Sequence, residues 1–205
     1  MGELIILRHG ETEWSRAGRH TGRTDVPLTA RGEEQARAIA PLVATHQVIR
    51  VLVSPAARAR RTAELAGLGT YETDPDLWEW DYGGYEGLTS AQIRMNVPGF
   101  YLWRDGTVPG DADHPGESVE QVGKRVDAVL DRVAPLLAEG NVALVAHGHV
   151  LRILTARWLG LDPAEGRLFA LDTGTLSTLG TEHEYPVITS WNVPPLESLI
   201  PPRGD

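Results

Sequence analysis

The chain has 205 residues, 41% of them hydrophobic, which is enough to bury one sizeable core without a second domain. A formal net charge of −9 argues against a surface that binds nucleic acid or an anionic membrane, and the absence of cysteine excludes disulfides and thiolate metal sites. No stretch resembles a signal peptide or is long enough to span a bilayer, so we expect a cytoplasmic protein.

Two apolar runs end abruptly in a histidine. Residues 4–7 are aliphatic and lead into Arg8 and His9, and residues 142–146 lead into His147. Uninterrupted apolar runs of this length are typical of strands that are buried on both faces. Because open α/β sheets place their chemistry at the carboxyl ends of such strands, we expect both histidines to lie in one crevice.

The other elements follow from apolar spacing and from the positions of glycine and proline. Segment 14–22 is expected to be a glycine-bearing loop. Helices are predicted at 29–46, 56–66, 89–96, 118–140 and 150–159, and strands at 48–53, 168–179 and 187–191. Segment 105–116 is predicted to be a mobile loop, and residues 194–205 a loose Pro-rich tail.

Strands that alternate with helices predict an α/β fold, a three-layer sandwich whose mostly parallel sheet is covered by helices on both faces. We expect residues 1–193 to form one domain. Right-handed crossovers would bring the carboxyl ends of the strands to one edge, which carries Arg8, His9, Ser54, Arg58 and His147. Guanidinium groups can bind phosphoryl oxygens bidentately and an imidazole can attack phosphorus, so this set matches a tetrahedral dianion.

Several segments, in order along the chain, resemble the histidine phosphatase superfamily, also called the phosphoglycerate-mutase-like or branch-one group. They are Arg8-His9-Gly10-Glu11-Thr12, residues 23–29, residues 54–63, Leu77-Trp78-Glu79 with Tyr82-Gly83, Gly116-Glu117-Ser118 and residues 145–148. The likeness extends to about residue 160. It implies a phosphoglycerate-mutase-like fold and a catalytic domain.

The resemblance further implies a phosphatase that uses no metal and no cofactor. His9 would be the nucleophile that becomes a phosphohistidine, and Glu79 would protonate the leaving oxygen and later activate water. The catalytic set it implies is Arg8, His9, Arg58, Glu79 and His147, and the phosphate- and substrate-binding set is Arg8, Ser15, Thr21, Gly22, Arg58, Tyr82, His147 and Gly148. Because His9 must attack while neutral and Glu79 must start protonated, we expect activity to favour mildly acidic pH.

Structural alternatives accompany these roles. A lone histidine is usually structural, so the role of His147 depends on its pairing with the His9 motif. Asp81 and Glu86 compete with Glu79 as the acid, and the spacing to the Tyr-Gly pair favours Glu79.

Other polar residues near these motifs are expected to have other roles. His149 is expected on the following helix and outside the site, and His20 either near the substrate or on the surface. Arg60 and Arg61 fit a solvated helix face. The loops at 16–22 and 100–116 should set specificity.

Departures from the family pattern decide among activities. Ser15 stands where phosphoglycerate mutases usually carry asparagine, and segment 100–106 is short where mutases have an insertion with paired arginines. Segments 14–15, 21–22 and 103–106 are more similar to acid phosphatases and sugar-bisphosphate phosphatases. We therefore predict a phosphomonoesterase acting on a small phosphorylated metabolite such as a sugar phosphate. A phosphoglycerate mutase and a catalytically silent phospho-ligand-binding protein are the alternatives, and a homodimer through the apolar stretches beyond Leu168 is left open.

Overall fold

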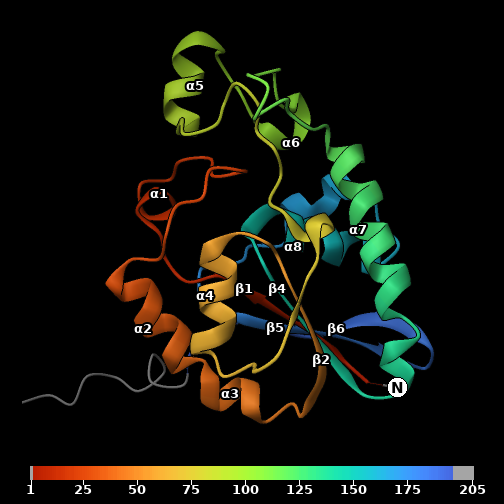
Figure 1. Ribbon diagram of the computed structural model, residues 1–205. Coiled ribbons are helices and arrows are strands. Elements are labelled where there is room, and N and C mark those ends of the chain that lie inside the picture. The colour runs from red at the N-terminus through yellow and green to blue at the C-terminus, as the bar shows by residue number, and fades with distance from the viewer. Residues whose placement is uncertain (1, 196–205) are drawn as a thin grey trace, which may run out of the picture.

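The computed structural model describes residues 2–195 and is centred on a six-stranded sheet (Figure 1). The strands are β1 (Leu4–Arg8), β2 (Val48–Val53), β3 (Glu72–Thr73), β4 (Asn141–Ala146), β5 (Leu176–Glu182) and β6 (Tyr185–Val193). Their order is β3-β2-β4-β1-β5-β6. The first four are parallel to one another, β5 is antiparallel to β1, and β6 is antiparallel to β5. The mostly parallel α/β sheet predicted above is therefore confirmed.

Helices connect these strands. The α-helices are α1 (Glu13–Arg16), α2 (Ala30–Ala38), α3 (Ala40–Ala44), α4 (Ala57–Leu65), α5 (Ser90–Asn96), α6 (Leu102–Asp105), α7 (Val119–Val133) and α8 (Gly148–Trp158). Short 3₁₀ helices are η1 (Pro75–Leu77), η2 (Leu136–Ala138) and η3 (Pro163–Leu168). Within residues 2–195, no helix combines the length and the apolar character that crossing a membrane requires.

Helices cover both faces of the sheet, as expected. Successive side chains of a strand point to opposite faces, and β1 follows this rule: Leu4 and Ile6 pack with α7 and α8, whereas Ile5 and Leu7 pack with α3 and α4. All four side chains are at most 1% exposed. Figure 1 shows α7 on one side of the sheet and α2 to α4 on the other. Burial of apolar surface on both faces thus fixes the central strand between two helical layers.

The register of the two central strands positions the site. β1 and β4 are parallel neighbours with Arg8 opposite Ala146, so they end level and each is followed by a histidine. The backbone N–H of His9 continues the ladder by donating to the carbonyl of Ala146 at 3.0 Å. Two strands far apart in the sequence therefore deliver His9 and His147 to the same edge.

Prolines divide two of the predicted helices. The helix expected at 29–46 is split at Ile39 into α2 and α3, because Pro41 lies in the first turn of α3 and has no N–H to continue the ladder. The helix expected at 118–140 ends at Val133, and Pro135 leads into η2. Because the apolar spacing continues across both breaks, the sequence pattern did not indicate them.

Three further expectations were wrong in detail. The loop expected at 14–22 contains α1, which Thr12 and Ser15 cap reciprocally. The strand expected at 168–179 begins only at Leu176, since η3 ends at Leu168 and an irregular segment follows. The short β3 and α6 were not predicted. Of the expected Pro-rich tail, residues 196–205 lie outside the described residues.

Candidate active site

A cavity of about 330 Å³ opens where β1 and β4 end. Seven of the predicted site residues line it: Arg8, His9, Ser15, Thr21, Glu79, Tyr82 and Gly148. Gly22, Arg58 and His147 do not line it. The prediction thus located the cavity, but it did not separate the residues on its wall from those behind the wall.

His9 has one ring nitrogen held and the other free. Its Nδ1–H donates to the carbonyl of Gly10 at 2.7 Å, which leaves Nε2 without a hydrogen and without a partner among residues 2–195. The side chain is only 5% exposed, and burial together with the neighbouring guanidiniums of Arg58 and Arg8 lowers the pKa of His9 well below its usual value. A neutral imidazole with a free lone pair is the form that can act as a nucleophile.

Behind His9, His147 is fully buried and both of its ring nitrogens are bonded to protein. Arg58 Nε donates to its Nδ1 at 3.1 Å, so Nε2 carries the hydrogen and donates to Ser54 Oγ at 2.7 Å. Burial first, and then Arg58, lower the pKa of His147 well below its usual value. The rings of His9 and His147 lie 5.1 Å apart, edge to face.

Arg58 is a fully buried cation fixed by backbone carbonyls. Its Nη1 donates to Thr24 O at 2.9 Å, and its Nη2 donates to Gly22 O at 2.9 Å and Thr21 O at 3.3 Å. Gly22 permits this close packing, because a Cβ there would lie 2.7 Å from the carbonyl of Trp80. The predicted phosphate ligand Gly22 is therefore part of the clamp on Arg58.

Arg8 reaches the cavity with an unused donor. One of its Nη groups donates to the carbonyl of Leu171, whereas its Nε is buried and has no hydrogen-bond partner among residues 2–195. Gly148 makes room for this side chain, since a Cβ there would lie 3.2 Å from the guanidinium carbon. A buried cationic donor without an acceptor is costly unless a ligand completes it, so Arg8 is suited to bind an anion.

Glu79 is bonded to the start of α8. Its Oε1 accepts the backbone N–H groups of Trp80 at 2.9 Å and Val150 at 2.8 Å, and its Oε2 accepts that of His149 at 3.0 Å. A carboxylate oxygen has room for about two donors, so Oε1 is saturated while Oε2 retains a free site. Glu79 is 5% exposed and lines the cavity, which makes Oε2 the atom able to exchange a proton with a ligand.

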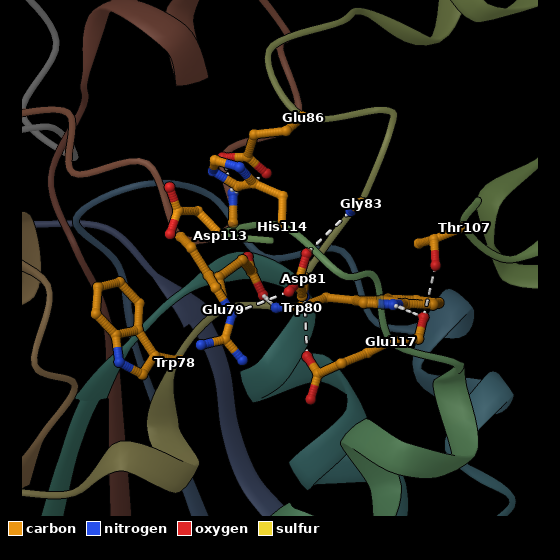
Figure 2. A network of polar contacts seen from close by, with 12 residues as sticks. Trp78, Glu79, Trp80, Asp81, Gly83, Glu86, Thr107, Asp113, His114 and Glu117 are labelled. Carbon is orange, nitrogen blue, oxygen red and sulfur yellow. Dashed lines mark hydrogen bonds and ion pairs between the residues drawn. The ribbon is translucent and has the colours of Figure 1, made fainter. Parts of the chain in front are cut away.

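A second layer of polar contacts holds the segment that carries Glu79. Figure 2 shows Trp80 and Asp81 tied to Glu117: Trp80 Nε1 donates to the carbonyl of Glu117 at 2.8 Å, and the Asp81 N–H to its carboxylate at 2.9 Å. Arg125 pairs with the same carboxylate and donates to the carbonyl of Glu79. The motif Gly116-Glu117-Ser118 therefore positions the candidate acid.

The two competing carboxylates are committed to other partners. Asp81 is fully buried, pairs with Arg23 at 2.9 Å and accepts the N–H of Gly83. Glu86 accepts the N–H groups of Gly22 and Thr24. Neither lines the cavity. The geometry thus favours Glu79 over both.

The remaining predicted ligands differ in what they can offer. Ser15 lines the cavity, but its hydroxyl is used in the cap of α1. Thr21 lines it as well, with its hydroxyl bonded to the carbonyl of Arg19. Tyr82 is buried, and burial and then Glu79 raise its pKa well above the usual value, so the phenol stays protonated. Its hydroxyl lies 2.5 Å from Nδ1 of His149.

Two histidines line the cavity as well. His149 was expected outside the site, which is wrong: it is the second residue of α8, and its side chain faces the cavity beside Trp103. His20 is 8% exposed rather than on the surface, and its Nδ1 donates to the carbonyl of Leu88. Burial lowers the pKa of both imidazoles.

The outer wall of the cavity was expected from the sequence only in part. It is formed by Arg19, Ser90, Arg94, Tyr101, Leu102, Trp103 and Arg152. The loops expected to set specificity contribute only in part, since segment 105–116 does not line the cavity. Across residues 2–195, no group of three or more His, Asp or Glu side chains is placed to hold a metal ion.

Comparison with known proteins places the chain in a family. Residues 4–194 match the model of the histidine phosphatase superfamily, branch 1. An acid phosphatase of Mycobacterium tuberculosis is 42% identical over 88% of this chain and 87% of its own length. A probable phosphoglycerate mutase GpmB of Serratia proteamaculans is 33% identical over 94% and 91%.

The solved structures agree with this placement. The product of an open reading frame from Mycobacterium tuberculosis superposes with a TM-score of 0.87 at 39% identity, covering 94% of this chain and 98% of that one. The fold, the order of the motifs and the matched length lead to one conclusion: the chain belongs to branch 1 of the histidine phosphatase superfamily.

Proposed function

We propose that this protein is a metal-independent phosphomonoesterase that moves the phosphoryl group of a small phosphorylated metabolite onto His9 and then to water. The free Nε2 of a neutral His9 carries the proposal, because His9 lines the same cavity as Arg8, whose buried Nε has no partner among residues 2–195, and as Glu79, whose Oε2 retains a free site. Nucleophile, anion-binding group and acid are thereby present together. The acid phosphatase relative supports hydrolysis as the outcome.

In the first step, Nε2 of His9 attacks phosphorus in line with the leaving oxygen. The bond from phosphorus to that oxygen breaks, and protonated Glu79 passes its proton from Oε2 to the leaving alkoxide. Arg8 and the backbone N–H of Gly148 at the start of α8 stabilise the equatorial oxygens. In the second step, water attacks the phosphorus of the phosphohistidine and Glu79 accepts a proton from that water. The bond from phosphorus to Nε2 breaks, which releases inorganic phosphate and returns His9 to its neutral form.

Arg58 and His147 act on this reaction from behind His9. Burial and then the charge of Arg58 lower the pKa of His9 and keep its imidazole neutral, while the neutral ring of His147 packs edge to face against it. The family resemblance implies that Arg58 and His147 contact the phosphoryl oxygens directly. For that contact, the hydrogen bond from Arg58 Nε to His147 Nδ1 must break.

The metabolite is proposed to be small and polar, for example a sugar phosphate. The cavity of about 330 Å³ is near the lower end of the roughly 300–1,000 Å³ typical of small-molecule sites. Phosphoglycerate mutase is the second candidate, favoured by the relatives that carry that name. In a mutase, the phosphohistidine would return its phosphoryl group to a hydroxyl of the glycerate substrate rather than to water.

The test is phosphate release by purified protein in the presence of a chelator, beside a His9→Gln variant. The substrates are p-nitrophenyl phosphate, a panel of sugar phosphates and 3-phosphoglycerate. Release that the variant abolishes supports the phosphatase. Isomerisation of 3-phosphoglycerate without release would support the mutase, and binding of phosphate without either reaction would support a silent binding protein.

A further inference from the structure

The cavity continues beyond the reacting groups. Past His9 and Glu79 it is bordered by Arg19 from the segment after α1, Arg94 from α5 and Arg152 from α8. Figure 1 shows α5 and α6 away from the sheet, so this end combines elements outside the central layers with α8, which packs on the sheet. At about 330 Å³ the cavity has space for roughly ten water-sized groups, more than a single phosphoryl group fills.

These three arginines differ from most others in the chain by having no carboxylate partner. Among residues 2–195, most arginines lie within 4.0 Å of an Asp or Glu oxygen, as in the pairs of Arg23 and Arg157. No carboxylate of the described residues lies within that distance of Arg19, Arg94 or Arg152. The chain carries a formal charge of −9, so its surplus acids are placed elsewhere.

The arginines are nevertheless held in place. Arg152 lies over the ring of Trp103 at 4.7 Å, and its Nε and Nη2 donate to the carbonyls of Gly166 and Arg167 while Nη1 has no partner among the described residues. Arg94 donates from Nε to the carbonyl of Phe100 at 2.9 Å, which leaves both of its Nη groups unused within residues 2–195. Arg152 is partly buried, and a partly buried cation that lacks a counter-charge costs free energy, whereas Arg19 and Arg94 are exposed and keep free donors.

We infer that Arg19, Arg94 and Arg152 form a second anion-binding site, and that the substrate carries a second anionic group besides the phosphoryl group that is transferred. The inference rests on the proposed function and names its substrate class. Carboxylate and phosphate share the chemistry that recognises guanidinium donors, so either group fits. The carbon skeleton between the two anions would lie along Tyr82 and Trp103, which line the cavity and both pack against His149, with Trp103 also in contact with Arg152.

The test compares ligands that differ only in the second charge. 3-Phosphoglycerate and glycerol 3-phosphate differ by a carboxylate in place of a hydroxymethyl group, and fructose 1,6-bisphosphate and fructose 6-phosphate differ by a phosphate. Dissociation constants are measured by calorimetry on a His9→Ala variant, and kcat/KM for the same ligands on the wild-type protein. The first pair tests a carboxylate and the second pair a phosphate.

In at least one pair, the ligand with the second anion is expected to bind at least about tenfold more tightly. Arg94→Gln and Arg19→Gln should each reduce that ratio severalfold. Arg60→Gln is the matched control, because Arg60 is also exposed and without a carboxylate partner among residues 2–195 but lies on α4, outside the cavity. The ratio of dissociation constants for Arg60→Gln should equal that of the protein in which Arg60 is unchanged.

Two outcomes would overturn the second site: dissociation constants that differ by less than about twofold within both pairs, or a difference that Arg94→Gln and Arg19→Gln leave unchanged. If p-nitrophenyl phosphate is hydrolysed under that outcome, the phosphatase stands without it. A preference for the second anion in calorimetry, with no hydrolysis of any substrate, would keep the site and reject the proposed reaction. Absence of binding by all four ligands would reject both.

Discussion

Replacing Glu79 with glutamine separates its chemical role from its structural role. The amide has the shape of the carboxylate, and its oxygen can still accept the two N–H groups that now bond Oε1, from Trp80 and Val150. Its NH₂ group must then face the N–H of His149, which donates to Oε2 at 3.0 Å. The variant therefore loses one hydrogen bond to a charged acceptor and the proton that the proposed mechanism passes to the leaving group.

The two losses have different sizes. A hydrogen bond to a charged group contributes about 1.5–3 kcal/mol, so we expect Glu79→Gln to lower the free energy of unfolding by about 2 kcal/mol. Loss of a general acid costs about 10²- to 10⁴-fold in rate. The rate loss should depend on the leaving group, because an alkoxide needs the proton far more than the p-nitrophenolate ion does.

The assay measures kcat/KM for glycerol 3-phosphate and p-nitrophenyl phosphate in wild type, Glu79→Gln and Glu86→Gln. Glu86 is the matched control, since its carboxylate also accepts backbone N–H groups but does not line the cavity. We expect a much larger loss for glycerol 3-phosphate than for p-nitrophenyl phosphate in Glu79→Gln alone. Equal losses for the two substrates in that variant would refute the assignment of Glu79 as the acid.

Three further predictions follow from the same contacts. Gly22→Ala should reduce kcat/KM at least tenfold, because the new Cβ would lie 2.7 Å from the carbonyl of Trp80 and displace the loop that clamps Arg58; a variant with wild-type kinetics would count against this clamp. Arg125→Ala should lower the free energy of unfolding by about 3 kcal/mol, measured in denaturant, since it removes a largely buried partner, with a side chain 14% exposed, from Glu117 and a donor from the carbonyl of Glu79. The free energy of unfolding should fall as pH drops below about 6.5, by about 1.4 kcal/mol per pH unit for each histidine whose folded-state pKa burial lowers, because the unfolded chain then binds more protons. These histidines are His9, His20, His147 and His149. Asp111 raises the pKa of His114, so this one residue stabilises the fold as pH falls and offsets part of the loss. A free energy of unfolding that is unchanged between about pH 7.5 and about pH 5.5 would contradict the neutrality of the buried histidines.

The sheet and its reactive edge could be predicted because both depend on local patterns. Continuous apolar runs defined β1 and β4, and the polar residues directly after them had to share one edge once the strands were parallel neighbours. The motif around His9 added the family, and through it the roles of Arg58 and Glu79. These inferences need no knowledge of how distant side chains pack.

The parts that were missed depend on tertiary contacts. The outer wall of the cavity brings together the segment after α1 with α5, α6 and α8, whose spacing along the chain carries no periodic signal. His149 was placed outside the site because helical position alone does not fix which way a side chain near the first turn points. Arg58 donates to backbone carbonyls within residues 21–24. The sequence did not predict these contacts, because the helix carries several arginines and nothing in it shows which of them turns inward.

The most direct measurement of the account is to look for the phosphoryl group on the protein itself. Wild-type protein is mixed with p-nitrophenyl phosphate, quenched in alkali within the first turnover, digested and analysed by mass spectrometry. We expect a peptide that contains His9 to carry one acid-labile phosphoryl group, and the same peptide from His9→Gln to carry none. Phosphate release by the wild type with the label on another residue, or with no label during turnover, would contradict the central role of His9.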